Sequence, residues 1–505
     1  MRSNYHIILK SAMQTFKSIS FLDKRSQKSK IVPISFTERE QDLYTSMNKL
    51  SSQEIRSIIG YSDYSDLCIA AERDKRNVSQ FIKFLLDRAI KDSNGIIAAS
   101  DVTFKNSKVI PFNRWYPYIE GYSPDFVKSL IKKYSIKPGI IYDPFAGTGT
   151  TLFAADAMGN STYYSEINPL LQFLIKAKLE VLKLAHNEWR IIGNDLMLLK
   201  TKLLKFNHKE NTILDRNYKN VFKNSIYFPD YNYKEILQAK SFLESEDDSL
   251  SKNILTIAIL SCLIPSSYLK KQGDLRFKTK KELEKKIPRF SELLCAKIDD
   301  IYNDLTNGNT TVSQVRHNHT LIHANAKCIN EVSCDKISYV ITSPPYLNGT
   351  NYIRNTKLEL WFLGHLRTES DLRSFRDQIL TSGINDVKVS NLLQIDIESK
   401  SLLLSQTMVS LKETAYDVRI PQMAECYFAE MFQIFSGLLP KLASGARLLI
   451  DIGDSVFNGV HIQTDDILIE ILQNIGYKFV EKTKLRERRS RGGQTVTQVL
   501  IVMAN

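Results

Sequence analysis

The sequence predicts an α/β protein built on a doubly wound, mostly parallel sheet that carries helical insertions. Short apolar segments alternate with segments of helical periodicity from residue 140 to residue 185, and the alternation resumes from residue 319 to the end of the chain. A glycine-rich turn, residues 143–151, joins the first apolar segment to the helix that follows it. Such alternation is typical of a parallel sheet covered by helices on both faces.

The composition narrows the class of protein. The chain has 505 residues and a formal net charge of +13, which favours a polyanionic partner, most simply nucleic acid. Its six cysteines are scattered and form no Cys-x-x-Cys pair, so neither a metal cluster nor a disulfide framework is expected. Because there is no secretory signal and no apolar run of about 18 residues, we expect a cytoplasmic protein.

Periodicity and charge divide the chain into four regions. Residues 1–105 are charged and helical in pattern. Residues 106–195 and 319–505 carry the strand–helix alternation, and residues 196–318 form a helical, basic insertion between them. A second helical insertion is expected at about residues 365–425.

The glycine-rich turn, Asp-Pro-Phe-Ala-Gly-Thr-Gly-Thr-Thr, lies where open α/β sheets bind ligands, beyond the carboxyl end of a strand. It is neither a Walker loop nor a Gly-x-Gly-x-x-Gly fingerprint. Glu166 ends the next strand, where a carboxylate can accept hydrogen bonds from both hydroxyls of a ribose. A cofactor with a ribose and no pyrophosphate is therefore expected, and S-adenosylmethionine meets both conditions. The expected cofactor-binding residues of this region are Asp143, Pro144, Phe145, Gly147, Gly149, Thr150, Glu166 and Asn168.

A second unusual stretch, Val-Ile-Thr-Ser-Pro-Pro-Tyr at residues 340–346, ends another predicted strand. Prolines neither extend a sheet nor begin a helix interior, so secondary structure does not explain them. Their fixed φ angles would instead hold the carbonyl of Pro344 in one place. The stretch therefore predicts a positioned hydrogen-bond acceptor at the carboxyl edge of the sheet.

Together these stretches resemble the amino-group DNA methyltransferases, which methylate cytosine N4 or adenine N6. The glycine turn resembles their cofactor motif, residues 165–169 resemble their ribose-binding motif, and Thr-Ser-Pro-Pro-Tyr resembles their catalytic motif. Residues 114–131 resemble the segment that closes over the methionine end of the cofactor, and residues 445–455 resemble a later strand. The resemblance covers most of residues 110–505 apart from the insertions. It implies a Rossmann-like S-adenosylmethionine-dependent methyltransferase fold and double-stranded DNA as the partner.

The resemblance implies catalytic roles for Ser343, Pro344, Pro345 and Tyr346, and these residue types suit amino-group chemistry. The lone pair of an exocyclic amino nitrogen is delocalised into the ring, which makes it a poor nucleophile. The side-chain oxygen of Ser343 and the carbonyl of Pro344 would accept its hydrogens and free the lone pair. Tyr346 would stack on a flipped base, which is worth roughly 1–3 kcal/mol.

Two features bear on the target base and on the cofactor. The chain contains no Pro-Cys dipeptide, so the sequence indicates no thiolate nucleophile that could attack carbon 5 of cytosine. Ser343 stands where many adenine enzymes carry Asp or Asn, which favours cytosine N4 over adenine N6. Asn325 stands where relatives usually have an Asp that contacts the adenine of the cofactor, and an amide oxygen can still accept from that amino group.

Contacts to DNA are expected from basic residues. The insertion has a dense basic stretch, which is interpreted either as a surface that contacts phosphates or as a solvated helix face. The basic loop at residues 485–494 is open to the same two interpretations. We expect the insertion, with the region 1–105, to flank a DNA cleft opposite Tyr346. The residues expected to contact DNA are Lys270, Lys271, Arg276, Lys278, Tyr352 and Arg354.

Two alternative functions remain open. RNA amino-methyltransferases of the guanine-N2 type carry similar motifs, but they usually have Asp before the prolines and strands in an N-terminal RNA-binding domain. A catalytically silent DNA-binding subunit on the same fold is the other alternative. The resemblance alone implies a setting in a bacterial restriction-modification or defence system, with a cognate restriction or defence subunit as a further partner.

Overall fold

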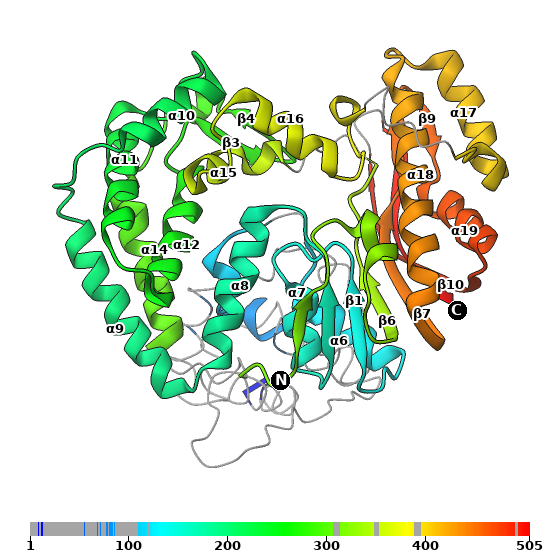
Figure 1. The fold of residues 1–505 in the computed structure, drawn as a ribbon, viewed down its shortest axis with the longest axis horizontal. Helices are drawn as coiled ribbons and strands as arrows, with labels where there is room; N and C mark the ends of the chain where they lie inside the picture. Colours follow the sequence, from blue (N-terminus) through cyan, green and yellow to red (C-terminus); the bar gives the residue numbers. More distant parts are fainter. Residues whose placement is uncertain are drawn as a thin grey trace.

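The computed structural model describes residues 110–118, 121–306, 314–347, 353–387, 395–489 and 493–505, together with scattered positions before residue 110. The expected helical region 1–105 lies largely outside these residues, and Tyr352 lies outside them entirely. Figure 1 shows a central sheet with helices on its right-hand side and a larger helical lobe on its left.

A seven-stranded sheet forms the centre of the described fold, in the order β10-β11-β7-β6-β1-β2-β5. Neighbouring strands from β5 to β7 are parallel, whereas β11 runs antiparallel to both β7 and β10. The predicted doubly wound, mostly parallel sheet is confirmed. The chain order reverses between β1 and β6, where such sheets form ligand sites. The strands are β1 (Ile140–Asp143), β2 (Ser161–Tyr164), β5 (His319–Leu321), β6 (Ile337–Thr342), β7 (Leu442–Gly453), β10 (Lys478–Arg489) and β11 (Thr495–Ala504).

Helices cover both faces of this sheet because its central strands are apolar on both sides. Val340 of β6 packs in the core that includes α18 (Arg419–Leu438) and α19 (Thr464–Ile475), whereas its neighbour Ile341 packs in the core that includes α6 (Pro124–Lys133). The side chain of Ser123 caps α6 by accepting from the backbone of Phe126 at 3.3 Å. The glycine-rich turn leads into α7 (Thr150–Asp156), and β2 leads into α8 (Pro169–Lys183).

The first insertion forms the helical lobe. The predicted border between residues 195 and 196 falls inside α9, so the lobe begins about one helix earlier than expected. Its interior is formed around α12, which is buried from Ile254 to Leu263. The helices of the lobe are α9 (His186–Leu203), α10 (Thr212–Phe222), α11 (Asp230–Ser245), α12 (Leu250–Leu263), α13 (Lys280–Leu283) and α14 (Phe290–Thr306).

A hairpin lies in the lobe where the sequence predicts only helix. Its strands are β3 (Leu269–Gln272) and β4 (Asp274–Phe277), and Gly273 turns between them with φ of 74°. Asn355 follows the Ser-Pro-Pro-Tyr stretch in the chain, and its side chain forms two hydrogen bonds with this hairpin. Its oxygen accepts from the backbone of Leu275 at 2.8 Å, and its amide donates to the Gly273 carbonyl at 2.9 Å.

The second insertion contains α16 (Glu369–Gln378) and α17 (Leu402–Thr414), within the predicted range of residues 365–425. The next helix, α18, packs on the sheet and belongs to the main fold. None of the described helices is both long and apolar enough to cross a membrane. The remaining elements are α15 (Lys357–Leu363), β8 (Ser455–Phe457), β9 (Val460–Ile462) and the 3-10 helices η3 (Asn113–Trp115), η4 (Ala326–Glu331), η5 (Arg354–Thr356), η6 (Ile384–Asp386), η8 (Glu398–Lys400) and η9 (Leu439–Lys441).

A buried carboxylate attaches the segment before β1 to the lobe. Asp304 on α14 accepts from the Phe112 backbone at 3.3 Å and from the Trp115 indole at 2.9 Å. The guanidinium of Arg114 donates to the same carboxylate from Nε at 3.1 Å and from Nη2 at 2.5 Å. This segment continues to Tyr118, which lines a cavity at the carboxyl end of the sheet, so the lobe helps to position one wall of that cavity.

We expect Asp304→Ala to lower the free energy of unfolding by about 3–5 kcal/mol, because it leaves Arg114 without its buried partner. Asp300→Ala is the matched control: its carboxylate lies 3.8 Å from Arg114 and is half-exposed, so its loss should cost at most about 1 kcal/mol. Urea denaturation of both variants measures the difference, and equal losses would contradict the anchoring role of Asp304.

Candidate active site

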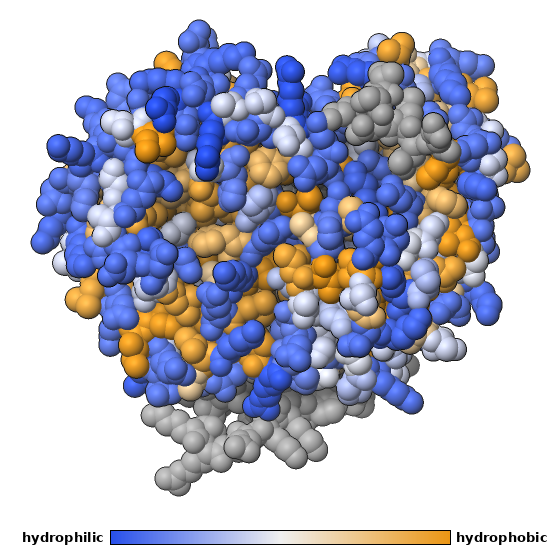
Figure 2. All heavy atoms as spheres, viewed as in Figure 1, coloured by the Kyte–Doolittle hydropathy of each residue, from blue (hydrophilic) through white to orange (hydrophobic). Residues whose placement is uncertain are grey.

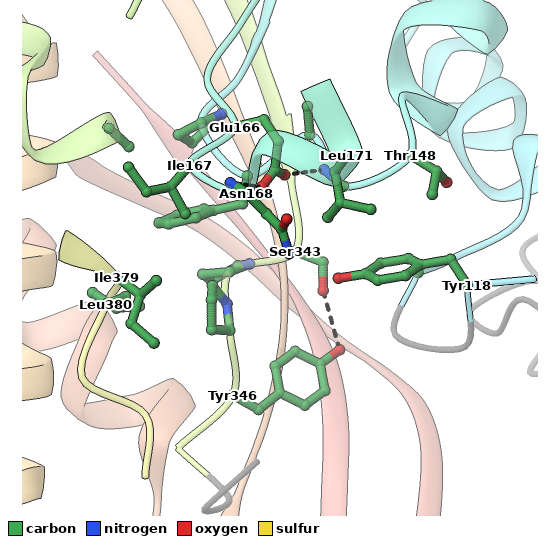
Figure 3. Close-up of a pocket in the computed structure, with 18 of the residues that line it drawn as sticks. Tyr118, Thr148, Glu166, Ile167, Asn168, Leu171, Ser343, Tyr346, Ile379 and Leu380 are labelled. Atoms are coloured by element: carbon green, nitrogen blue, oxygen red, sulfur yellow. Dashed lines mark hydrogen bonds between the residues drawn. The ribbon is translucent and has the colours of Figure 1, made fainter. Parts of the chain in front are cut away.

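A cavity of about 420 Å³ lies at the carboxyl ends of β1, β2 and β6. Figure 3 shows the hydroxyl of Ser343 directed toward the hydroxyls of Tyr118 and Tyr346, with Glu166 and Asn168 on the other side of the cavity. The structure thus brings the two unusual stretches of the sequence to one place. The expected residues that line the cavity are Pro144, Phe145, Gly147, Thr150, Glu166, Asn168, Asn325, Ser343, Pro344, Pro345 and Tyr346.

The glycine loop and Glu166 form one hydrogen-bonded unit. The backbone of Gly147 donates to one carboxylate oxygen of Glu166 at 2.8 Å, and the backbone of Asn168 donates to the other, also at 2.8 Å. Gly147 adopts φ of 57°, which favours glycine. Burial raises the pKa of the Glu166 carboxyl to about 8, although the two N–H donors lower it. Each oxygen keeps lone-pair capacity for a further donor.

Asp143 does not line the cavity, but its hydrogen bonds connect the glycine loop to the end of β6. Its carboxylate is 1% exposed and accepts from the Phe145 backbone at 3.0 Å and from the Thr342 hydroxyl at 2.7 Å. Thr151 and Tyr122 also donate to it, at 2.5 and 3.3 Å. Burial raises the pKa of Asp143. Any effect of this residue on the cofactor is therefore indirect, through the loop and the end of β6.

Gly149 also lies outside the cavity lining. Its φ is 85°, and a Cβ atom there would come within 2.9 Å of the Phe153 ring and 3.1 Å of the Ile175 side chain. Both contacts belong to the protein interior. Gly149 therefore shapes the start of α7, and its influence on a ligand is again indirect.

Two amides position the walls of the cavity. The side-chain oxygen of Asn168 accepts from the Leu170 backbone at 3.0 Å and caps α8, while its amide donates to Thr356 at 2.9 Å. Asn325 caps η4 through Lys327 at 3.0 Å, and its amide donates to the carbonyl of Gln378 at 3.2 Å. That second bond draws the segment after α16 to the cavity, where Ile379 and Leu380 form an apolar wall (Figure 3).

The Ser-Pro-Pro-Tyr stretch contacts two polar residues, Gln498 and Asp451, that lie outside the sequence motifs. The hydroxyl of Ser343 donates to that of Tyr346 at 3.3 Å, and the amide of Gln498 on β11 donates to the same hydroxyl at 2.8 Å. Gln498 also donates to Asp451 on β7 at 2.6 Å. Burial raises the pKa of Asp451 to about 6, while hydrogen bonds with Gln498, Tyr346 and Ser343 lower it.

A signal for Asp451 was present in the sequence: it is a charged residue inside the apolar run Leu-Leu-Ile-Asp-Ile-Gly. A buried carboxylate in a central strand needs partners, so it marks either a functional or a structural polar network. Gln498 gives a weaker signal, as a polar residue that precedes Val-Leu-Ile-Val. Tyr118 lies in the segment expected to close over the cofactor, and only the fold shows it beside Ser343.

Most of the expected DNA-contact residues are engaged within the protein. Glu282 pairs with Lys270 at 2.6 Å and with Arg276 at 2.8 Å. The amine of Lys278 donates to the Ser267 carbonyl at 2.6 Å, and that of Lys271 lies 5.3 Å from the centre of the Tyr118 ring. Arg354 is exposed at the start of η5. The contact of these residues with DNA stays a prediction, and Glu282 reduces the charge available for it.

In comparisons with known proteins, the chain is similar to DNA methylases and type II methyltransferases. A model of the family described as DNA methylase matches residues 71–176, which include the glycine loop and Glu166. The chain is 28% identical over 465 residues to the type II methyltransferase M.AvaI of a Nostoc species, covering 86% of this chain and 93% of that protein. The type II methyltransferase M.BsoBI of Geobacillus stearothermophilus is 25% identical over 447 residues, covering 78% and 84% of the two chains.

We expect Gly149→Ala to lower the melting temperature even without any ligand. The left-handed backbone costs alanine about 1–2 kcal/mol, and the contact with Phe153 adds to this cost. Gly159→Ala is the matched control, because Gly159 has φ of 84° and nothing within 4 Å of its Cβ position. Thermal denaturation should show a larger loss for Gly149→Ala than for Gly159→Ala. Equal losses would mean that packing around Gly149 is unimportant.

Proposed function

The chain belongs to the amino-group DNA methyltransferases, and from this premise we propose that it methylates the N4 amino group of a cytosine flipped out of double-stranded DNA. S-adenosylmethionine is the methyl donor of this family. The observation that supports the proposal most directly is that a single cavity is lined both by the glycine loop with Glu166 and by Ser343 to Tyr346.

The residues of the cavity fit S-adenosylmethionine. Glu166 would accept from the ribose hydroxyls through the lone pairs that Gly147 and Asn168 leave unused. Phe145 and Leu380 offer apolar surfaces to an adenine ring, and the side chain of Asn325 lies at the same wall. When bound, the cofactor supplies an electrophilic methyl group carried on a positively charged sulfur.

Ser343 and Pro344 would activate the amino group of the target base. Their oxygens would accept the hydrogens of the amino group and draw its nitrogen toward tetrahedral geometry, which leaves the lone pair free to attack the methyl carbon. Tyr346 packs against Gly453, where a Cβ atom would lie 3.2 Å from the ring. Gln498 holds the Tyr346 hydroxyl, so the ring has a defined orientation for stacking on the flipped base.

Asp451 would accept the proton that the amino group must lose. When the amino group is methylated, the Ser343 oxygen would accept the proton that the nitrogen loses, and the proton of that hydroxyl would pass to Asp451. A carboxylate with a pKa of about 6 is mostly ionised at neutral pH and can accept it. The preference for cytosine N4 rests on Ser343, since a hydroxyl stands where many adenine enzymes carry the carboxylate of Asp or the amide of Asn.

The helical lobe and the second insertion would hold the DNA duplex. Figure 2 shows the outline of the molecule notched at its upper edge, between the helical lobe and the side formed by α17 and α18. We infer that DNA enters there, with residues 196–318 as the recognition region and residues 1–105 as a further DNA or partner contact. A cytoplasmic role in a bacterial restriction-modification or defence system, with a cognate restriction or defence subunit, completes the proposal.

Methyl transfer to DNA tests this function. Wild-type protein with labelled cofactor should transfer label to DNA and not to RNA, and mass spectrometry of the DNA nucleosides should find N4-methylcytosine. Label in RNA alone would overturn the proposal, and N6-methyladenine would overturn its choice of base.

We expect Tyr346→Ala to lower kcat/KM for DNA by roughly 5- to 150-fold, which corresponds to about 1–3 kcal/mol of lost base stacking. Its melting temperature and its affinity for the cofactor should change little. Tyr346→Phe keeps the ring and loses only the hydroxyl, so most of the activity should remain. Steady-state kinetics of the two variants give the comparison, and near-normal activity of Tyr346→Ala would exclude stacking on this ring.

The activity should depend on the ionisation of Asp451. Because its pKa is raised to about 6, the ionised form that accepts a proton accumulates above that pH, and kcat should rise across that value. Asp451→Asn should remove this rise and lower kcat by about 10²- to 10⁴-fold, with the affinity for the cofactor retained. Single-turnover rates between about pH 5 and 8 are the measurement. A variant that keeps the same pH profile would show that Asp451 takes no proton.

A further inference from the structure

The last strand pair places arginines at the mouth of the active-site cavity. Arg486 and Arg488 on β10 both line the cavity that contains Ser343 and Tyr346. They lie two residues apart on an extended strand, so their side chains share a face, whereas Glu487 and Arg489 belong to the opposite face. Arg486 is opposite Gln498 in the register and Arg488 is opposite Val496.

The two arginines differ in what they contact. Nε of Arg486 donates to the side-chain oxygen of Gln498 at 2.5 Å, so this guanidinium belongs to the network around Asp451. Arg488 is exposed, and among the described residues it forms no ion pair. The nearby Glu487 is paired with Lys484 at 2.7 Å. An arginine that lines a cavity without a carboxylate partner is available for an anion from outside the protein.

We propose that Arg488 binds a backbone phosphate beside the flipped nucleotide, while Arg486 holds Gln498 in place. This inference rests on the proposed function. A base that enters the cavity brings its sugar and flanking phosphates to the cavity mouth. A guanidinium binds phosphate through two parallel hydrogen bonds, which would fix the position and the orientation of the nucleotide. The contact would offset part of the cost of taking the base out of the helix.

The neighbouring Arg489 provides a matched control within the same strand. It carries the same charge, is also exposed, and does not line the cavity. A general attraction of β10 to DNA would affect Arg488→Ala and Arg489→Ala alike. A phosphate held at the cavity mouth affects only Arg488→Ala.

The experiment first identifies the methylated sequence by sequencing modified bases in DNA from a host that expresses the wild-type protein. Binding of that DNA is then measured across a range of salt concentrations, together with single-turnover methylation. Arg488→Ala should reduce the slope of log affinity against log salt by about 0.9, as expected for one lost phosphate contact, and should slow methylation at least 5-fold. Arg489→Ala should keep the slope and the rate near those of the wild type.

Two further measurements distinguish the role in positioning from simple charge. Placing the target base in a mismatch lowers the cost of flipping, so the slower methylation by Arg488→Ala should be partly restored on such DNA. Arg488→Lys should keep the salt slope, because the charge remains, and should recover only part of the rate, because the paired hydrogen bonds are lost. The affinity for S-adenosylmethionine should be the same in all variants.

The outcomes separate this inference from the function on which it rests. If the wild-type protein transfers no methyl group to DNA, the proposed function fails. If the wild type methylates DNA but Arg488→Ala and Arg489→Ala give the same slope and the same rate, only the phosphate contact at Arg488 is overturned.

Discussion

The active site depends on one buried carboxylate, that of Asp143. It accepts from the backbone of Phe145 in the glycine loop and from the hydroxyl of Thr342, which immediately precedes Ser343. An isolated buried charge would cost several kcal/mol, and the surrounding donors offset this cost only while the ends of β1 and β6 stay together. The loop next to Glu166 and the stretch that begins at Ser343 are therefore held at one separation before any ligand arrives. Such prior positioning is what a reaction between two bound molecules requires.

Two further carboxyls surround the cavity in different environments. Glu166 accepts from two backbone N–H groups, and its pKa is nevertheless raised to about 8 by burial. Asp451 is equally enclosed, but hydrogen bonds with Gln498, Tyr346 and Ser343 leave its pKa at about 6. Burial therefore raises the pKa of both carboxyls, and it raises that of Glu166 more than that of Asp451. Perturbed carboxyls of this kind gather at functional sites, and here each sits at a different end of the cavity.

Local sequence predicted the sheet and the motif residues, because apolar alternation and the Gly and Pro positions are read within a few residues. The sequence does not predict the β3–β4 hairpin because Lys270 to Phe277 is rich in charged residues and its only apolar alternation is the short pair Leu275 and Phe277; the hairpin is held by Asn355, about 80 residues away in the chain. Contacts of this range also bring Asp451, Gln498 and Arg488 to the cavity, although the sequence alone marks Arg488 only as part of a basic loop. Each is brought to Ser343 by strand order, which local patterns do not reveal. Conversely, the sequence predicts that Lys270 and Arg276 contact DNA, and only the fold shows that both form ion pairs with Glu282.

The attachment of the hairpin by Asn355 has a consequence for how this enzyme could change its specificity. The lobe and the segment after the Ser-Pro-Pro-Tyr stretch pack together through a shared apolar core, and the side chain of Asn355 adds two hydrogen bonds, one from its oxygen and one from its amide. If the lobe of a related enzyme replaced this one, its hairpin would face the Asn355 of this chain unless residues 353–356 were exchanged together with the lobe. An exchanged lobe therefore keeps these two hydrogen bonds only if its hairpin has the same backbone turn, because Asn355 binds backbone groups of Gly273 and Leu275.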